Sequence, residues 1–140
     1  MSWQTVDIEQ VYFIHQAMIK RAGTRASIRD FALLHSAVER PKATFDGKEL
    51  YPSIFLKAAS LLQSLCLNHP FTDGNKRTAW LATKRLLKIN GYHLKAKKME
   101  AADFMVEVDN VLPQRDPESG GKKPDITRIS KWLKNHSIKI

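Results

Sequence analysis

The sequence predicts an all-α fold, a helical bundle that carries a small β-hairpin flap. Apolar residues recur at three- and four-residue spacing along most of the 140-residue chain, which is the period of a helix with one buried face. One short segment, centred on Asp46 and Gly47, instead has the turn signal of two paired strands. The length suits one hydrophobic core, so residues 1–140 are expected to form a single domain.

Two helices are predicted in the first part of the chain, over residues 6–21 and 28–40. Gly23 and Pro41 are placed to end them. His15 lies on the apolar face of the first helix and is expected to be a core histidine. The other inward-facing residues are expected to be Ile8, Val11, Met18, Leu33, Leu34 and Ala37.

The next segment, residues 42–51, is predicted to be the flap. Asp46-Gly47 is a dipeptide typical of hairpin turns, and Phe45 and Leu50 flank it. The flanking strands are too short to form an independent sheet, so we expect a small hairpin that projects from the bundle.

The most apolar helix is predicted over residues 53–68, with Pro70 stopping it. A helix that is apolar over most of its circumference usually lies at the centre of a bundle. A further helix is predicted from about residue 75 to residue 90, with Gly91 as its C-terminal cap. The buried residues of the two helices are expected to be Ile54, Phe55, Ala58, Ala59, Leu61, Leu62, Leu65, Cys66, Ala82, Leu86 and Ile89.

The last part of the chain predicts an extended piece over residues 92–98 and a helix over residues 100–112. The polar residues 113–124 are expected to form a loop. Asp125 is a good N-cap for a last helix that ends near Asn135. The inward-facing residues here are expected to be Phe104, Val108 and Val111.

Composition bounds the setting and the partners. The formal net charge of +9 favours nucleotides, nucleic acids or acidic proteins without choosing among them. The single cysteine, Cys66, excludes a disulfide framework and favours a reducing, cytoplasmic setting. Residues 1–10 lack the order of a signal peptide and no apolar run is long enough to cross a bilayer, so no membrane contact is expected.

Residues 69–77, with the sequence HPFTDGNKR, form a loop that leads directly into a predicted helix. The N–H groups of a helix N-terminus favour an anion, and Lys76 and Arg77 add positive charge that suits phosphate. Asp73 supplies the kind of carboxylate that magnesium takes besides phosphate oxygens. His69 can accept a proton from an attacking hydroxyl.

These groups match what transfer of a phosphate-containing group requires: a base, a metal ligand, and donors aimed at developing negative charge. Gly74 allows the backbone to approach a ligand closely. The loop differs from a P-loop, because Asn75 stands between Gly74 and Lys76. His69 and Asp73 lack a partner pair such as HExxH, so zinc is not expected.

The HPFTDGNKR motif resembles the signature of the Fic/Doc family, in the variant typical of the Doc (death-on-curing) toxins. The similarity covers about residues 11–94. It includes Ser27-Ile-Arg-Asp after the first predicted helix, the flap, and Asn90-Gly91 at the end of the helix that follows the motif. The resemblance implies a Fic-type helical bundle with a flap.

The resemblance also implies a role for each matching residue. His69 would be the general base that activates a target hydroxyl, Phe71 would turn inward to anchor the loop, and Asp73 would bind Mg²⁺. The phosphate-binding residues would be Gly74, Asn75, Lys76 and Arg77. The flap would hold a target segment by strand addition, through Thr44, Phe45, Asp46, Gly47, Lys48, Glu49, Leu50 and Tyr51.

Lys76 separates two chemistries within the family. Most Fic enzymes have glycine there and transfer AMP, whereas the lysine of Doc toxins would turn the nucleotide to present its terminal phosphate. The resemblance therefore implies phosphorylation of a protein hydroxyl by ATP or another nucleoside triphosphate. Elongation factor Tu is the typical target, and arrested translation the outcome. Protein adenylylation (AMP transfer) stays open as the alternative.

An antitoxin supplied in trans is the expected regulatory partner. Some Fic proteins carry their own inhibitory helix, but the nearest stretch here, residues 5–10, lacks its final small residue. That stretch is expected to be a solvent-facing helix start. The net charge of +9 suits an acidic antitoxin.

A non-enzymatic, basic module that binds nucleic acid is the rival class. Its cations would be Lys84, Arg85, Lys88, Lys95, Lys97 and Lys98. The predicted helix after the motif is apolar along one face and starts with an anion-binding motif, unlike a base-reading helix. Direct nucleic-acid binding is therefore not expected.

Overall fold

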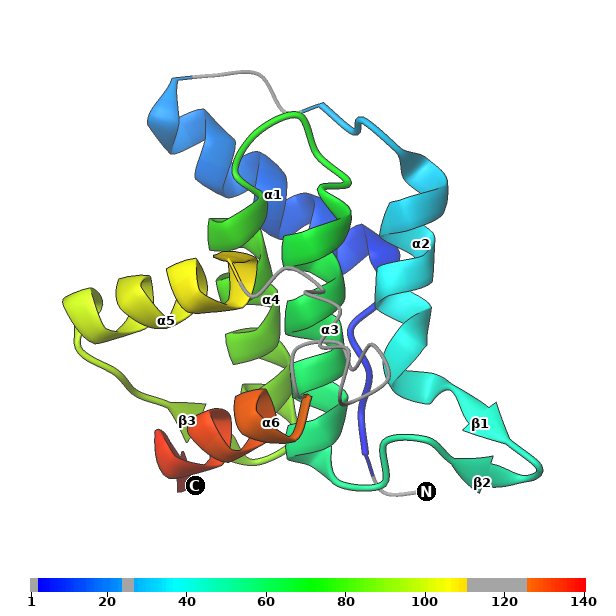
Figure 1. The fold of residues 1–140 in the computed structure, drawn as a ribbon. Helices are drawn as coiled ribbons and strands as arrows, with labels where there is room; N and C mark the ends of the chain where they lie inside the picture. Colours follow the sequence, from blue (N-terminus) through cyan, green and yellow to red (C-terminus); the bar gives the residue numbers. More distant parts are fainter. Residues whose placement is uncertain (1–2, 24–26, 111–125) are drawn as a thin grey trace.

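The computed structural model describes residues 3–23, 27–110 and 126–140, and in these ranges it is a bundle of six α-helices (Figure 1). The helices are α1 (Ile8–Ala22), α2 (Phe31–Glu39), α3 (Ile54–Asn68), α4 (Asn75–Ile89), α5 (Lys98–Asn110) and α6 (Ile126–Asn135), with a 3₁₀ helix, η1 (Arg40–Lys42), after α2. The strands are β1 (Thr44–Phe45), β2 (Lys48–Glu49), β3 (Tyr92–Leu94) and β4 (Ser137–Lys139). The predicted fold class is confirmed.

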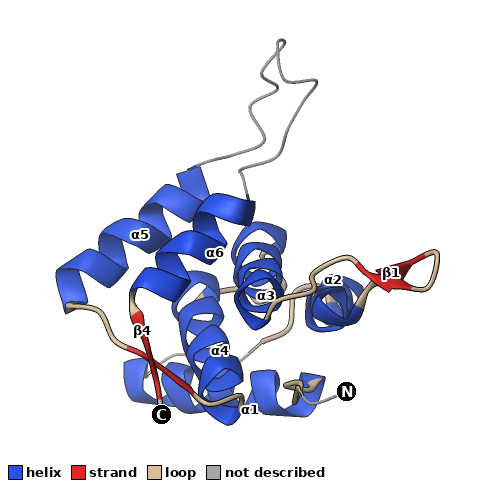
Figure 2. Cartoon of the chain, turned by 90° about the horizontal axis from the view of Figure 1, so that it is seen from below, coloured by secondary structure: helices blue, strands red, loops and turns tan. Residues whose placement is uncertain are grey.

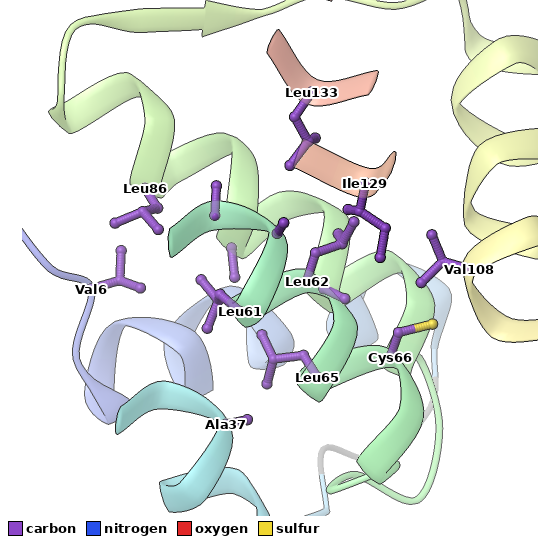
Figure 3. Packing of buried hydrophobic residues seen from close by; sticks show 14 of the residues in the cluster. Val6, Ala37, Leu61, Leu62, Leu65, Cys66, Leu86, Val108, Ile129 and Leu133 are labelled. Atoms are coloured by element: carbon purple, nitrogen blue, oxygen red, sulfur yellow. The ribbon is translucent and has the colours of Figure 1, made fainter. Parts of the chain in front are cut away.

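Helix α3 lies at the centre and contacts α2, α4, α5 and α6 (Figures 1 and 2). Nearly every side chain from Phe55 to Cys66 is buried, as its apolar circumference predicts. Figure 3 shows Leu61, Leu62 and Leu65 of α3 among residues of the surrounding helices. Each fully buried leucine contributes about 1.5–3 kcal/mol to folding. Within the described ranges, none of the helices has the length and apolar character that a bilayer crossing needs.

The start of α2 was predicted three residues too early. Asp30 is the N-cap, because its side chain accepts a hydrogen bond from the Leu33 N–H, and the helix begins at Phe31. Ile28 instead forms an isolated antiparallel bridge with Phe71. Within α2 the buried residues are Leu34, Ala37 and Val38, whereas Leu33 is only partly buried.

The flap, residues 44–51, is a hairpin as predicted. Strands β1 and β2 pair in antiparallel register, and Asp46 and Gly47 both have positive φ, as the tight turn requires. The base of the flap is tied to the bundle: Lys57 of α3 pairs with Glu49 at 3.2 Å, and Arg40 donates to the Tyr51 hydroxyl at 2.8 Å. The hairpin itself projects from one side of the bundle (Figures 1 and 2).

The C-terminal strand β4 was not predicted. It pairs antiparallel with β3, which joins Tyr92 to Lys139 and Leu94 to Ser137. The extended conformation of β3 was predicted, but its partner lies more than 40 residues away and has no strand-length apolar pattern. The predictions for Val111, the loop at 113–124 and the Asp125 cap lie outside the described residues.

Candidate active site

His69 stands at the end of α3, where the chain leaves the central helix. It is the C-cap and has left-handed backbone angles, φ 47° and ψ 55°, which cost a non-glycine residue about 1–2 kcal/mol. The guanidinium of Arg29 offsets this cost, since it donates to the carbonyl oxygens of His69 at 2.7 Å and Asn68 at 2.9 Å. The His69 side chain is 53% exposed and is therefore accessible to a substrate.

Residues 27–30, which precede α2, hold the motif loop, residues 69–74, in place by backbone hydrogen bonds. The backbone N–H groups of Arg29 and Asp30 both donate to the Pro70 carbonyl, and the Thr72 N–H donates to the Ser27 carbonyl at 3.1 Å. These bonds explain why residues 28–30 are not helical. They make the loop a fixed element rather than a loose connection.

Phe71 anchors the loop from inside. Its side chain is 1% exposed and stacks on the His15 ring, with centroids 3.7 Å apart and planes 8° apart. His15 is fully buried, which confirms the prediction of a core histidine, and burial lowers its pKa. His15 Nε2 lies 2.9 Å from the Asp73 carbonyl oxygen, which can only accept, so Nε2 carries the hydrogen of the neutral ring.

Asn75 closes the loop on itself. Its side-chain oxygen accepts from the Phe71 N–H and its side-chain nitrogen donates to the Phe71 carbonyl, both at 2.9 Å. We expected this amide to line a phosphate pocket. Asn75 does line the groove described below, but its amide is occupied by Phe71.

Gly74 is the N-cap of α4, and glycine is required there for two reasons. Its φ of 76° favours glycine, and a Cβ at this position would lie 2.4 Å from Met18 Cε and 3.2 Å from Ile19 Cδ1 of α1. No side chain caps the N-terminus of α4. Its first N–H groups, together with Lys76 and Arg77 in the first turn, could therefore bind an anion.

A basic groove of about 1370 Å³ opens over this helix N-terminus, between α1, α4 and α5. Typical ligand pockets hold about 300–1,000 Å³, so the groove is large enough for a nucleotide. The described lining includes two carboxylates, Asp73 and Asp109, against a larger set of cations. These cations are Arg21, Lys76, Arg77, Lys84, Arg85, Lys88, Lys95 and Lys98.

Asp109 of α5 is the site residue that sequence reasoning missed. Its carboxylate lies 3.4 Å from Lys76 Nζ and 3.8 Å from His69 Nε2, and the Cys66 Sγ is 3.9 Å away. Asp109 lies more than 30 residues beyond the motif, and no local pattern marks it. Only the packing of α5 beside the loop brings it to the groove.

The structure does not bring the flap to the motif loop. The base of the flap contacts the first turn of α3 through Lys57, whereas His69 follows the last residue of the same helix. The two predicted functional segments therefore lie at opposite ends of α3 (Figure 1).

Asp73 is suited to a metal ion that enters the groove already bound to the phosphates of a nucleotide. Its Oδ1 accepts from the Gly74 N–H at 2.8 Å, which orients the carboxylate at the groove. In the described part of the chain, no group of three or more His, Cys, Asp or Glu residues could hold a metal by itself. Magnesium commonly binds through one or two carboxylates plus substrate phosphates, so the donor set fits that ion.

Cys66 is predicted to be unreactive in the folded protein. It is fully buried, and burial together with the nearby Asp109 raises the pKa of its thiol to about 12. The reactive thiolate is then negligible at pH 8. We expect no labelling by iodoacetamide in native protein and complete labelling in denaturant. Rapid native labelling would show that α3 and α5 separate readily at this point.

The fold and the site define a class: helical domains in which the loop between two packed helices joins a histidine to an uncapped, basic helix N-terminus. The sequence profile of the Fic/DOC family matches residues 5–87, which is more than half of the chain, and the chain belongs to this family. The predicted family is confirmed. The matched range includes the flap and the motif loop but not α5 or α6.

A curated relative adds a more specific likeness. The chain is 51% identical over 85 residues to a protein named Toxin Doc from Mycolicibacterium smegmatis. The match covers 61% of this chain and 61% of that protein. The chain therefore spans less than two thirds of the relative's length.

Proposed function

We propose that the chain is the toxin of a toxin–antitoxin pair and transfers the terminal phosphate of a nucleoside triphosphate to a hydroxyl group of a target protein. One observation carries the chemistry: an accessible histidine stands on a clamped loop directly before a cation-rich helix N-terminus. The likeness to Toxin Doc supports the biological role.

The residues divide the reaction among them. The first N–H groups of α4 and the Arg77 guanidinium bind phosphate oxygens. Asp73 would hold Mg²⁺, which would supply positive charge at the phosphates. His69 takes the proton of the target hydroxyl while the hydroxyl oxygen forms a bond to the terminal phosphorus. The bond from that phosphorus to the bridging oxygen breaks, and the nucleoside diphosphate leaves.

Lys76 favours phosphate transfer over AMP transfer. It is a bulky cation that lines the groove in the first turn of α4, and its ammonium is directed toward Asp109 on α5. A nucleotide must place its phosphates around this group. AMP transfer, in which the bond to the innermost phosphorus breaks, is the second candidate because the anion site itself suits either end of a triphosphate.

The partners follow from two exposed surfaces. The flap presents a short exposed hairpin, in which Phe45 of β1 is 74% exposed, and it suits a target segment that adds by backbone hydrogen bonds. Elongation factor Tu is the target that the family resemblance suggests. The cations of the groove suit an acidic antitoxin.

Parallel incubations with labelled nucleotide test the function. Purified protein, Mg²⁺ and lysate receive ATP labelled at the terminal or at the innermost phosphate. We expect transfer of the terminal label to a protein, and mass spectrometry of the product then gives the target residue. Transfer of the innermost label alone would replace phosphorylation with adenylylation. Transfer of neither label, with binding to DNA or RNA in a gel-shift assay, would favour the non-enzymatic class.

A further inference from the structure

Asp109 is the carboxylate of the groove to which the proposed chemistry gives no role of its own. It lies on α5, outside the residues 5–87 that match the family profile. Its side chain is 24% exposed, and its two oxygens face the motif, Oδ2 toward Lys76 and Oδ1 toward His69. Oδ1 also faces Cys66 of α3. One carboxylate thus lies beside both the proposed base, His69, and the ammonium of Lys76.

A carboxylate in this place works against the binding of an anion. Like charges in a groove repel each other, and Asp109 also competes with phosphate for the ammonium of Lys76. A groove shaped for nucleotide affinity alone would have no acid here. The position of Asp109 therefore calls for a benefit other than affinity.

We infer that Asp109 is a positioning residue, which holds the imidazole of His69 and the ammonium of Lys76 in place at the expense of nucleotide affinity. The inference rests on the proposed function of His69 as the base. His69 is half exposed, so packing against the core does not by itself fix its ring. A carboxylate beside Nε2 favours the tautomer with hydrogen on Nε2 and leaves Nδ1 as the proton acceptor.

Cys66 fits the same arrangement. Its thiol lies 3.9 Å from Asp109 Oδ1 and, because burial keeps it protonated, it is a neutral donor that adds no further negative charge. Asp109 is thus bordered by an ammonium, an imidazole and a thiol. These three neighbours restrict the rotation of the Asp109 carboxylate.

The test is Asp109→Asn, which keeps the shape and removes the charge. We expect kcat for phosphate transfer to fall about tenfold or more, because the base loses its orientation. The Kd of a non-hydrolysable ATP analogue should fall about threefold or more, because a like charge has left the groove. Asp109→Glu should recover part of the lost kcat. Asp103→Asn is the matched control on the same helix, since Asp103 is exposed and lies outside the groove, and it should change neither value.

The outcomes separate this inference from the proposed function. Slower turnover with tighter binding supports positioning, whereas weaker binding together with slower turnover would show a merely structural role and overturn the inference. An unchanged kcat in Asp109→Asn, with His69→Ala inactive, would overturn it while leaving the function intact. Activity that survives in His69→Ala would instead remove the proposed function. Ring signals of His69 in nuclear magnetic resonance spectra, which should move in Asp109→Asn and not in Asp103→Asn, test the contact without any turnover.

Discussion

Replacing His69 with alanine is expected to lower the rate of phosphate transfer by about 10²- to 10⁴-fold, the usual contribution of a general base. The side chain is half exposed at the end of α3, so its removal leaves no cavity in the core. The melting temperature should therefore stay within a few degrees of the original value. The rate is measured with terminally labelled ATP and the identified target, and the melting temperature by circular dichroism.

His35→Ala is the matched control for this change. His35 is also an exposed histidine, 60% exposed on α2, and its ion-pair partner Glu39 lies outside the groove. Its removal should leave the transfer rate unchanged. A His69→Ala protein that keeps more than a tenth of the original rate would rule out His69 as the base.

Phe71→Ala is expected to destabilise the fold by about 3–5 kcal/mol, as is typical for a large aromatic side chain removed from a core. Phe71 is 1% exposed, and its removal would also leave the face of the buried His15 ring without its stacking partner. The loss should appear as a lower midpoint in urea with little change in slope. Because the same residue shapes the motif loop, transfer activity should fall even at temperatures where the variant is folded.

Phe45→Ala provides the comparison for stability. Phe45 is 74% exposed on the flap, so its removal should cost no more than about 0.5 kcal/mol. The contrast between the two phenylalanines isolates burial as the cause. A loss below about 1 kcal/mol for Phe71→Ala would mean that the loop is not held by this side chain.

The helices and the flap were predictable because their signals are local. The periodic apolar residues of α3, the Asp46-Gly47 turn and the Gly91 stop each depend on neighbours within a few residues. The beginning of α2 was not predictable, because it depends on Pro70, about 40 residues away. The backbone N–H groups of Arg29 and Asp30 donate to the Pro70 carbonyl, and these bonds keep both residues outside the helix. Strand β4 depends in the same way on a distant partner, β3.

The same difference between local signals and contacts distant in the sequence applies to the candidate site. His69, Asp73, Gly74, Lys76 and Arg77 lie within nine residues, so their chemistry could be inferred from the sequence, and the structure places all of them at one groove. Asp109 enters through the packing of α5, which no spacing in the sequence encodes. The contacts of Asn75 could not be predicted either. The sequence identifies the amide side chain, but its hydrogen bonds to Phe71 depend on the shape of the loop.

If the flap binds a target segment as proposed, the length of α3 sets the distance from that segment to His69, because the flap and His69 lie at opposite ends of this helix. Fifteen residues at 1.5 Å each separate the two ends by about 22 Å. At about 3.3 Å per extended residue, a target strand docked on the flap must carry its hydroxyl some six or seven residues away. Selection would then depend on the distance along an extended segment rather than on the residues beside the hydroxyl, and a target folded tightly around that hydroxyl would have to open locally before it could react.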